Sequence, residues 1–483
     1  MYNKIINVIK DKKIAILGFG KEGKSTYNFI RKYLKDKEID ILDKNNEIII
    51  EDNNVNLILG DNYLKDLEKY DLIIKTPGIS LNNIDTSKIK NKITSECNLL
   101  LENIECKKIG ITGTKGKSTT SSLIYKIIKD QYEDTYLCGN IGIPIFDYLD
   151  KITKDTILVI EMSAYHTEYI KKSPDISIIL NLYEEHLDYF KTKEKYFLSK
   201  LNMFKYLNND SIGIYSEDNE ILKELVEKEI KNKNLIKVLS TDDGDKIDNN
   251  MIFCDEQKIY MKELNKIKEL YNLSNERNLL GRHNIENIMF ALAISEKLNL
   301  NLNKTIKSIN EFQPLEHRME LVGKYNNIIF YNDSIATIPE ATINCIETLK
   351  KVNTLIFGGM DRKINYDNFV EYLKNSKIEN LICLKDTGYT IGKKLENYKS
   401  IFYAENMKEA VEYAYKYTKK DNICLLSPAA SSYNFYKNFE EKGKEYKNII
   451  KYFANKVWKY FFFICFFDKI KDENRRRLLW MKV

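Results

Sequence analysis

Short runs of β-branched and aliphatic residues alternate with amphipathic stretches along most of this 483-residue chain. Examples are Lys13–Leu17 (KIAIL), Asp71–Lys75 (DLIIK) and Lys108–Thr112 (KIGIT), each followed by a turn. This alternation is typical of βαβ units that build a parallel sheet. Between 216 and 280 the pattern is less regular and favours charge-rich helical stretches, whereas 282–300 has a helical period. The sequence therefore predicts an α/β protein.

The length and three separate βαβ series predict three domains. We expect a Rossmann-like N-terminal domain over 1–95 and a central P-loop ATPase-like domain with a parallel sheet over 96–313. A second Rossmann-like domain is expected over 314–452. Residues 453–483 form an atypical tail, whose apolar run Tyr460–Phe467 is too short to span a membrane.

Charge and hydrophobicity exclude several classes of protein. The 76 Lys and Arg against 70 Asp and Glu leave a net charge of only +6, without the concentrated basic patches that nucleic-acid binding requires. No run approaches the roughly 18–20 apolar residues of a membrane span. The first ten residues lack the apolar core and cleavage site of a secretory signal. We therefore expect a cytoplasmic protein with no nucleic-acid partner and no membrane span.

The sharpest local motif is GITGTKGKS, from Gly110 to Ser118, between a predicted strand and a predicted helix. Its glycines let backbone N–H groups surround phosphate oxygens, and the helix N-terminus adds positive charge. Lys117 can reach the β- and γ-phosphates, and the Ser118 hydroxyl can ligate Mg²⁺. The match to GxxxxGK[ST] is imperfect, because the first glycine would fall at Ile111. The residues predicted to hold ATP here are Gly113, Thr114, Lys115, Gly116, Lys117, Ser118 and Thr119.

A second glycine-rich loop, GFGKEG, follows the first predicted strand. Gly18, Gly20 and Gly23 match GxGxxG, and Asp43 ends the next strand at the spacing of a dinucleotide site. The signal is modest alone, because many such loops bind other nucleotides or only pack tightly. With the first motif, it predicts binding of two different nucleotides. A nucleotide-binding dehydrogenase, the hypothesis from another enzyme class, explains only this loop.

Other polar residues follow predicted strands, where open α/β sheets bind ligands. Glu161 beside the P-loop suits Mg²⁺, although a solvated strand end is an equal interpretation. His186 alone is more typical of a structural or surface histidine. Lys200 alone is typical of a solvated helix lysine.

Taken together, the motifs resemble the Mur ligase family, ATP-dependent amide ligases of peptidoglycan precursor synthesis. The resemblance covers about residues 10–450, and the joint order of the motifs is specific. The N-terminal and closing motifs look most like the member that adds D-glutamate to UDP-N-acetylmuramoyl-L-alanine. The motifs are GITGTKGKST (110–119), GNIG (139–142), EMS (161–163), EEHLD (184–188), GRHN (281–284), EHRME (316–320), NDSIAT (332–337) and SPAASSYNFYKNFEEKG (427–443).

The resemblance implies ATP and two Mg²⁺ sites. Ser118 and Glu161 would serve one ion, while His186 and Lys200 would face the other. Lys200 stands where the family carries a carbamylated lysine, and carbamylation would turn a cation into an anion suited to Mg²⁺. The catalytic residues would be Lys117, His186, Lys200 and Arg318.

The resemblance also implies the remaining binding residues, in a chain expected to be a monomer. ATP would further contact Asn284, Arg318 and Asp333. The UDP substrate would be held by the 18–25 loop, Asp43, Thr76, Gly78, Asn140 and Ser163. The incoming glutamate would meet Lys363, Ser432 and Phe439.

One departure affects the glutamate pocket. The family's DSKATN stretch reads DSIATI here, so that Ile335 replaces a lysine, and recognition of the carboxylate then falls to Arg362 or Lys363. The stereochemistry stays open, because a related subgroup adds L-glutamate. A catalytically silent binding protein is a further alternative, against which Lys117 and Glu161 argue.

Overall fold

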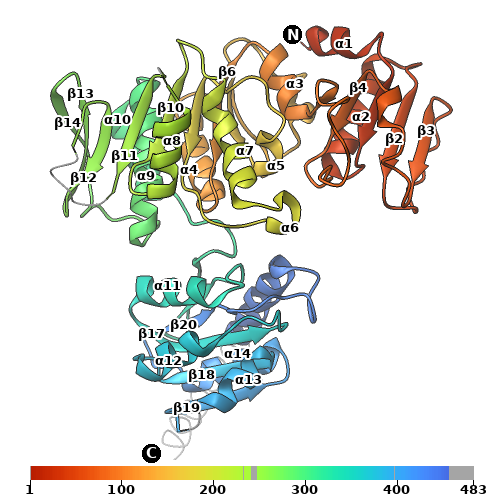
Figure 1. Cartoon of the computed structure of the whole chain (residues 1–483). Coiled ribbons are helices and arrows are strands. Elements are labelled where there is room, and N and C mark those ends of the chain that lie inside the picture. The colour runs from red at the N-terminus through yellow and green to blue at the C-terminus, as the bar shows by residue number, and fades with distance from the viewer. Residues whose placement is uncertain (1, 232, 241–246, 396, 456–483) are drawn as a thin grey trace, which may run out of the picture. The chain divides into compact units, whose positions relative to one another are not determined.

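The computed structural model describes residues 2–231, 233–240, 247–395 and 397–455. The chain divides into two compact units, one ending at Phe312 and the other beginning at Gln313, and each is described by itself (Figure 1). The boundary predicted at 95/96 falls inside the first unit, and the three-domain division stays a prediction. The tail predicted over 453–483 lies outside the described residues from 456 onward.

The first unit contains a five-stranded parallel sheet with the order β3-β2-β1-β4-β5. Its strands are β1 (Ile14–Leu17), β2 (Ile39–Asp43), β3 (Val55–Leu59), β4 (Leu72–Lys75) and β5 (Ile93–Thr94). Its helices are α1 (Asn3–Ile9), α2 (Lys21–Tyr33), η1 (Leu67–Lys69) and α3 (Glu96–Asn103). The strand order reverses between β1 and β4, and open α/β sheets commonly bind ligands at the carboxyl ends of the strands at such a point.

A second sheet of the first unit has nine strands in the order β14-β13-β12-β11-β10-β9-β6-β8-β7. They are β6 (Lys107–Thr112), β7 (Thr135–Gly139), β8 (Ile157–Glu161), β9 (Ile176–Ile179), β10 (Ile212–Ser216), β11 (Leu235–Leu239), β12 (Met251–Cys254), β13 (Lys258–Glu263) and β14 (Lys266–Asn272). Strands β6 to β12 pair in parallel, as predicted.

The edge of this sheet differs from the prediction, because β13 and β14 are antiparallel to their neighbours. The sequence favoured helical stretches in this charged segment. Ile259 and Met261 instead alternate with the half-buried residues Lys258, Tyr260 and Lys262, a two-residue period that buries one face of the strand. The charged residues that indicated a helix are half-buried in β13 and exposed in β14.

Helices cover both faces of the nine-stranded sheet. They are α4 (Lys117–Lys129), η2 (Ile145–Tyr148), α5 (Ala164–Thr167), α6 (Leu187–Phe190), α7 (Lys193–Lys205), α8 (Glu220–Glu229), α9 (Arg282–Lys297) and α10 (Leu302–Glu311). Helices α4, α9 and α10 share one apolar core with the sheet. The opposite face, with α7, joins a core that continues to α2 and the five-stranded sheet. This continuous core accounts for the first unit being undivided.

The second unit has a six-stranded sheet with the order β15-β16-β20-β17-β18-β19. Its strands are β15 (Glu320–Tyr325), β16 (Ile328–Asn332), β17 (Val352–Gly359), β18 (Asn380–Asp386), β19 (Ser400–Ala404) and β20 (Ile423–Leu426). Its helices are α11 (Pro339–Leu349), α12 (Asp367–Asn375), α13 (Thr387–Lys394), α14 (Met407–Tyr417) and one over 439–455. All pairs are parallel except β15 with β16.

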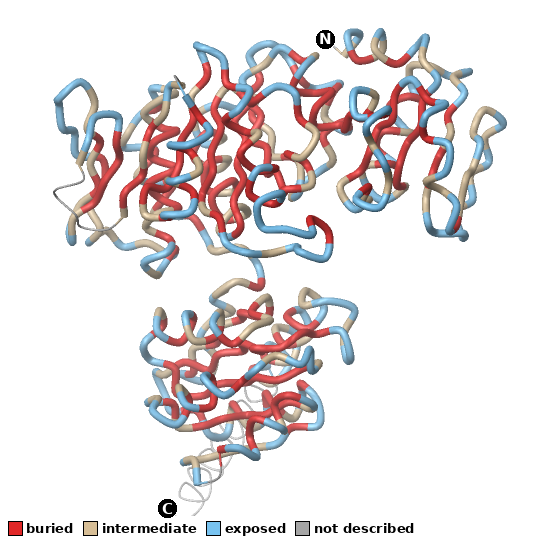
Figure 2. Tube along the Cα trace, in the orientation of Figure 1, coloured by how far each residue is buried: buried red, intermediate tan, exposed pale blue. Residues whose placement is uncertain are grey.

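Successive apolar side chains along each strand of this sheet point to opposite faces, so that a separate hydrophobic core forms on each face. In β17, Leu355 and Phe357 pack with α11, α12 and α13, while Ile356 faces the core that contains α14 and Tyr446. Figure 2 shows buried residues concentrated along the strands and exposed residues in the connections. Over the described ranges, no helix has the length and apolar character needed to cross a membrane.

Candidate functional site

The P-loop forms the turn between β6 and α4. Gly116 precedes α4 with φ +83°, and a Cβ there would lie 2.9 Å from Asn287 Oδ1, so both backbone and space require glycine. The Lys117 ammonium folds back over the turn and donates to the carbonyl oxygens of Gly113 and Thr114, at 2.9 Å each. The loop therefore has the shape of a phosphate cradle with a cation at its centre.

Lys200 lies on α7 and is buried, which corrects its local interpretation as a solvated lysine. Its Nζ donates to the Gly113 carbonyl at 2.9 Å and contacts Thr112 Oγ1 at 3.3 Å. Burial lowers the pKa of Lys200 well below its ordinary value, and the nearby charge of Lys117 lowers it further. A neutral amine is the form that reacts with CO₂, so this environment suits the predicted carbamylation.

Glu161 ends β8 beside the P-loop and is fully buried. Its Oε1 accepts a hydrogen bond from Asn140 Nδ2 at 2.7 Å, and its Oε2 lies 3.5 Å from Ser121 Oγ on α4. The backbone N–H of Asn140 also donates to the Glu161 carbonyl at 2.9 Å. The structure thus brings two predicted site residues into direct contact.

His186 precedes α6, in the left-handed conformation with φ +57°. Its imidazole is half-exposed and lies 5.3 Å from the Tyr165 ring and 5.8 Å from the Tyr196 ring. Burial lowers the pKa of His186, although the carboxylate of Glu185 opposes the shift. The ring is therefore neutral at pH 7, which is the form that binds metal ions.

Asn181, after β9, holds the P-loop in place. Its Oδ1 accepts hydrogen bonds from the backbone N–H groups of Thr114 at 3.1 Å and Lys115 at 2.8 Å. The Lys115 side chain leaves the loop and pairs with Glu185. The sequence interpretation missed this contact, although an amide residue at a strand end beside a glycine-rich loop was an available signal.

Asn284, predicted to contact ATP, lies in the first turn of α9 next to the P-loop helix. Its Oδ1 accepts from Asn287 Nδ2 at 2.9 Å, and Asn287 Oδ1 accepts from Thr120 Oγ1 on α4 at 2.9 Å. This chain of amides connects α9 to α4. The structure therefore places Asn284 near the P-loop, as the ATP-site prediction requires.

The donor set around the P-loop fits Mg²⁺. The Ser118 hydroxyl and Glu161 carboxylate offer hard oxygen ligands, and neutral His186 offers a nitrogen. Lys200 fits only as a carbamate, because an amine offers no anionic oxygen.

The second unit contains another cluster with metal-ligand spacing, formed by Glu316, His317 and Glu320. The Lys447 ammonium already contacts both carboxylates there, 2.5 Å from Glu316 and 2.8 Å from Glu320. A lysine therefore supplies the positive charge at this cluster.

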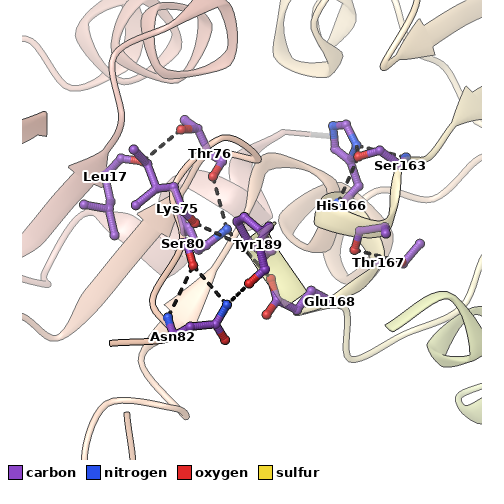
Figure 3. A network of polar contacts seen from close by, with 12 residues as sticks. Leu17, Lys75, Thr76, Ser80, Asn82, Ser163, His166, Thr167, Glu168 and Tyr189 are labelled. Atoms are coloured by element: carbon purple, nitrogen blue, oxygen red, sulfur yellow. Dashed lines mark hydrogen bonds and ion pairs between the residues drawn. The ribbon is translucent and has the colours of Figure 1, made fainter. Parts of the chain in front are cut away.

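The GFGKEG loop meets the carboxyl end of β4 within the first unit. Gly18 has φ +94°, and a Cβ there would lie 2.1 Å from Thr76 Oγ1. Thr76 Oγ1 donates to the Leu17 carbonyl at 3.0 Å, as Figure 3 shows. Asp43 Oδ2 accepts from the Phe19 backbone N–H at 2.6 Å. The structure thus brings Gly18, Asp43 and Thr76 together, with Asp43 supporting the loop backbone.

The second unit holds the predicted ATP residues Arg318 and Asp333. Asp333 is buried and accepts from Ser427 Oγ at 2.8 Å and from the Met319 backbone at 3.1 Å. Burial raises the pKa of Asp333 to about 6, against the lowering effects of these hydrogen bonds and of Arg318. Within the described residues, the buried Nε of Arg318 has no hydrogen-bond partner.

The residues predicted to meet glutamate are only partly brought together. Lys363 lines a cavity of about 420 Å³ together with Thr387 and Lys394. Ser432 is buried, and its Oγ has no hydrogen-bond partner among the described residues. Phe439 packs edge-on against His317, with ring centroids 6.0 Å apart. Neither Ser432 nor Phe439 lines the cavity at Lys363.

Comparison with known proteins supports the motif order. The family profile described as "Mur ligase middle domain" matches residues 111–295, and "Mur ligase, glutamate ligase domain" matches 317–430. A UDP-N-acetylmuramoylalanine--D-glutamate ligase of Clostridium botulinum (strain Langeland) is 32% identical over 467 residues, covering 93% of this chain and 98% of that protein. One of Clostridioides difficile (strain 630) is 34% identical over 455 residues, covering 91% and 98%. The chain belongs to the Mur ligase family.

Solved Mur ligase structures share the fold of this Mur ligase. MurF ligase from Thermotoga maritima, in complex with ADP, aligns with a TM-score of 0.57 and 16% identity over 93% of this chain and 97% of that one. The UDP-N-acetylmuramate-alanine ligase MurC from Thermotoga maritima gives a TM-score of 0.53 with 16% identity, over 90% and 98%. At this identity the likeness shows the fold alone.

A buried histidine of this Mur ligase was missed by the sequence interpretation. His166 lies three residues after Ser163 and contacts it, as Figure 3 shows. Its other ring nitrogen contacts Glu22, a residue of the GFGKEG loop. The available signal was the spacing, because the third residue after a helix N-cap commonly folds back onto the cap.

Proposed function

We propose that this Mur ligase joins D-glutamate to UDP-N-acetylmuramoyl-L-alanine at the expense of ATP, a step of peptidoglycan precursor synthesis. The observation that carries the proposal is the meeting of Lys117 and Lys200 at the Gly113 carbonyl, beside the buried Glu161. The names of the Clostridium botulinum and Clostridioides difficile relatives, which match over nearly the whole chain, support this substrate class. We expect a cytoplasmic monomer.

ATP would bind at the turn between β6 and α4. Mur ligases depend on ATP, and the Thermotoga maritima MurF ligase was solved with ADP. In this chain, the backbone N–H groups from Gly113 to Gly116 and the start of α4 would hold the phosphates. Lys117 would leave its carbonyl partners for the γ-phosphate, because a charged acceptor forms the stronger hydrogen bond. Asn284 is placed beside this helix, and Arg318 and Asp333 would contribute from the second unit.

The proposed reaction has two steps. The carboxylate of the L-alanyl group attacks the γ-phosphorus, giving an acyl phosphate and ADP, and the amine of glutamate then displaces phosphate to form the amide. Two anions must meet in the first step, so the site needs positive charge to stabilise the transferring phosphoryl group. Lys117 supplies it from the P-loop and Arg318 is proposed to supply it from the second unit.

Mg²⁺ at two sites would add to this charge. Ser118 and Glu161 would hold one ion, and His186 with carbamylated Lys200 would hold the other. When bound, the ions would polarise the phosphate oxygens and offset the repulsion of the attacking carboxylate. Asn140, which donates to Glu161 Oε1, would orient that carboxylate.

Substrate recognition is divided between the two ends of the chain. The UDP group would lie at the 18–25 loop, Asp43 and the Thr76–Ser80 segment, with Asn140 and Ser163 facing the sugar and peptide. Glutamate would bind in the second unit, where Lys363 is exposed and the Ser432 hydroxyl is unpaired within the described residues.

The test measures phosphate release from ATP with UDP-N-acetylmuramoyl-L-alanine and either D- or L-glutamate. Release that depends on the UDP substrate and on D-glutamate is the expected result. Absence of release with both isomers would contradict the ligase function.

Addition of L-glutamate is the second candidate. Ile335 replaces the lysine of the family's DSKATN stretch, which removes one cation from recognition of the glutamate carboxylates. Release with L-glutamate alone would overturn the assignment of the D-isomer while keeping the ligase class.

A further inference from the structure

Two buried side chains, Ser163 and His166, and the half-buried side chain of Glu22 connect the GFGKEG loop to the end of strand β8. Ser163 is the N-cap of α5, and its Oγ lies 2.7 Å from His166 Nδ1. His166 Nε2 lies 2.7 Å from Oε1 of Glu22, in the first turn of α2. His166 is 3% exposed, and the Glu22 side chain is 17% exposed. The Glu22 and His166 partners are 144 residues apart in the chain.

The backbone fixes which ring nitrogen of His166 carries the proton. The Ser163 backbone N–H points at Nδ1 over 3.1 Å, and because an amide N–H can only donate, Nδ1 is the acceptor. The proton of the neutral ring is therefore on Nε2, which donates to Glu22. A carboxylate that accepts from the far nitrogen holds a histidine in one tautomer and one orientation.

This tautomer determines what the Ser163 hydroxyl can offer a ligand. Nδ1 carries no hydrogen, so the hydroxyl is the donor in the 2.7 Å contact, where it shares the lone pair of Nδ1 with the backbone N–H, and its hydrogen points at the ring. The hydroxyl oxygen retains a lone pair beyond its long contact with the His166 backbone N–H at 3.4 Å. Ser163 therefore presents an acceptor, which suits an amide N–H and not a carboxylate or phosphate.

The surrounding charges maintain this arrangement. Glu96 is buried beside Glu22, and burial, with the charge of Glu22, raises the pKa of Glu96 well above its ordinary value. Glu96 accepts from Thr26 Oγ1 at 2.9 Å. Lys75, at the end of β4, interacts electrostatically with Glu22, whose negative charge raises the pKa of the Lys75 ammonium. Of these charged groups, the Glu22 carboxylate is the one in hydrogen-bond contact with the His166 imidazole.

We propose that His166 is a positioning residue, which with Glu22 holds the Ser163 hydroxyl as an acceptor for the amide N–H of the L-alanyl group. This inference rests on the proposed function and adds a residue and a contact to it. Ser163 follows Glu161 by two residues, so a substrate held at Ser163 has its alanyl carboxylate near the P-loop edge. The link to α2 makes this contact depend on the same loop that would bind UDP.

Steady-state kinetics test the proposal, using full-length wild type, Ser163→Ala, His166→Ala, His166→Asn and the double alanine variant. Loss of one hydrogen bond to the substrate should raise the KM for UDP-N-acetylmuramoyl-L-alanine about tenfold in each alanine variant. The KM for ATP should stay within about twofold, since the P-loop contacts are separate. The double variant should be no worse than either single one, because the two residues act as one unit.

His166→Asn is the conservative variant. Its amide oxygen can accept near the Nδ1 position but cannot reach Glu22, so it should recover part of the lost affinity. Equal increases in the KM values for both substrates, or additive effects in the double variant, would overturn the positioning role. So would His166→Asn behaving like His166→Ala.

A second measurement does not depend on activity. The chain has four histidines, so ¹⁵N-histidine labelling of the wild-type protein, with assignment through His166→Gln, can identify the tautomer of His166. A protonated Nε2 and a bare Nδ1 at pH 7.5 are expected, and a proton on Nδ1 would overturn the proposal. If wild type shows the expected tautomer but no ligase activity, the proposed function fails, and with it the assigned substrate contact.

Discussion

Lys117 and Lys200 both donate a hydrogen bond to the carbonyl oxygen of Gly113, each over 2.9 Å. The two lysines come from α4 and α7, and one of them is fully buried. Two ammonium groups at one carbonyl oxygen repel each other, so the arrangement is stable only if one lysine is neutral or an anion binds between them. The lowered pKa of Lys200 reflects the first solution, and bound phosphate or a carbamate would provide the second.

Replacing Lys200 by alanine should abolish most of the activity. Loss of a charged group at the transferring phosphoryl should lower kcat by about 10²- to 10³-fold. If the active form is a carbamate, a short carboxylic acid such as acetate should restore part of the rate, because it supplies the missing carboxylate. The measurement is phosphate release with increasing acetate.

The matched control for that experiment is Lys205→Ala, since Lys205 is on the same helix but exposed. It should retain the wild-type rate and show no response to acetate. Full activity of Lys200→Ala would remove the carbamate hypothesis.

Substitution of Lys117 should reduce catalysis far more than substitution of Lys115, although the two residues are only two positions apart. Lys117→Met should lower kcat/KM for ATP by about 10²- to 10³-fold, because the ammonium over the loop is lost. Lys115→Met should cost less than about fivefold, since its side chain forms an exposed pair with Glu185. Initial rates over a range of ATP concentrations measure both. Similar losses in the two variants would contradict this assignment.

Gly18 and Gly20 offer a comparison within one loop. Gly18→Ala should lower the free energy of unfolding by about 2–4 kcal/mol, because the positive φ and the Thr76 hydroxyl 2.1 Å from the new Cβ both oppose it. Gly20→Ala should change it by less than about 1 kcal/mol, as its Cβ meets nothing within 4 Å. Urea titration gives both values. Equal losses of unfolding free energy in the two variants would show that neither the positive φ nor the Thr76 contact requires glycine at position 18.

The buried Lys75 should make stability depend on alkaline pH. Burial lowers the pKa of Lys75 from 10.5 to about 8, and Glu168, 4.0 Å away, offsets only part of this (Figure 3). Below pH 8 the ammonium is charged in both the folded and unfolded states, so its burial cost is fully present. Between about pH 8 and 10.5 the unfolded state binds more protons, and stability contributed by this residue rises with pH.

Lys75→Met should therefore stabilise the protein at pH 7 by up to about 3 kcal/mol, and the gain should shrink as the pH rises from 8 to 10. Urea titrations at pH 7, 9 and 10 measure the difference from wild type. Lys88→Met is the control, because Lys88 is exposed and its difference should not vary with pH. If the gain in unfolding free energy of Lys75→Met did not change with pH, burial of a charged Lys75 would not be the cause of the gain.

The order of strands and helices was largely predictable, because hydrophobic period and turn chemistry are local. The strand before Gly18, the P-loop turn and helix α9 all lie where the sequence places them. The hairpin β13–β14 was not, because its charged residues suit a helix and a wet strand face equally. Pairing with the neighbouring strand β12 decides that this segment forms a strand and not a helix.

The sequence by itself determined the residue types of the candidate site and their order along the chain. Lys117, Glu161 and Asn140 are indicated by short motifs whose backbone geometry is set by adjacent residues. Only the tertiary structure decided the environment of Lys200, which contacts Gly113 across 87 residues, and of His166, which contacts Glu22 across 144. Burial and charge pairing set the chemistry of such side chains, and both arise from contacts between distant parts of the chain that local patterns do not encode.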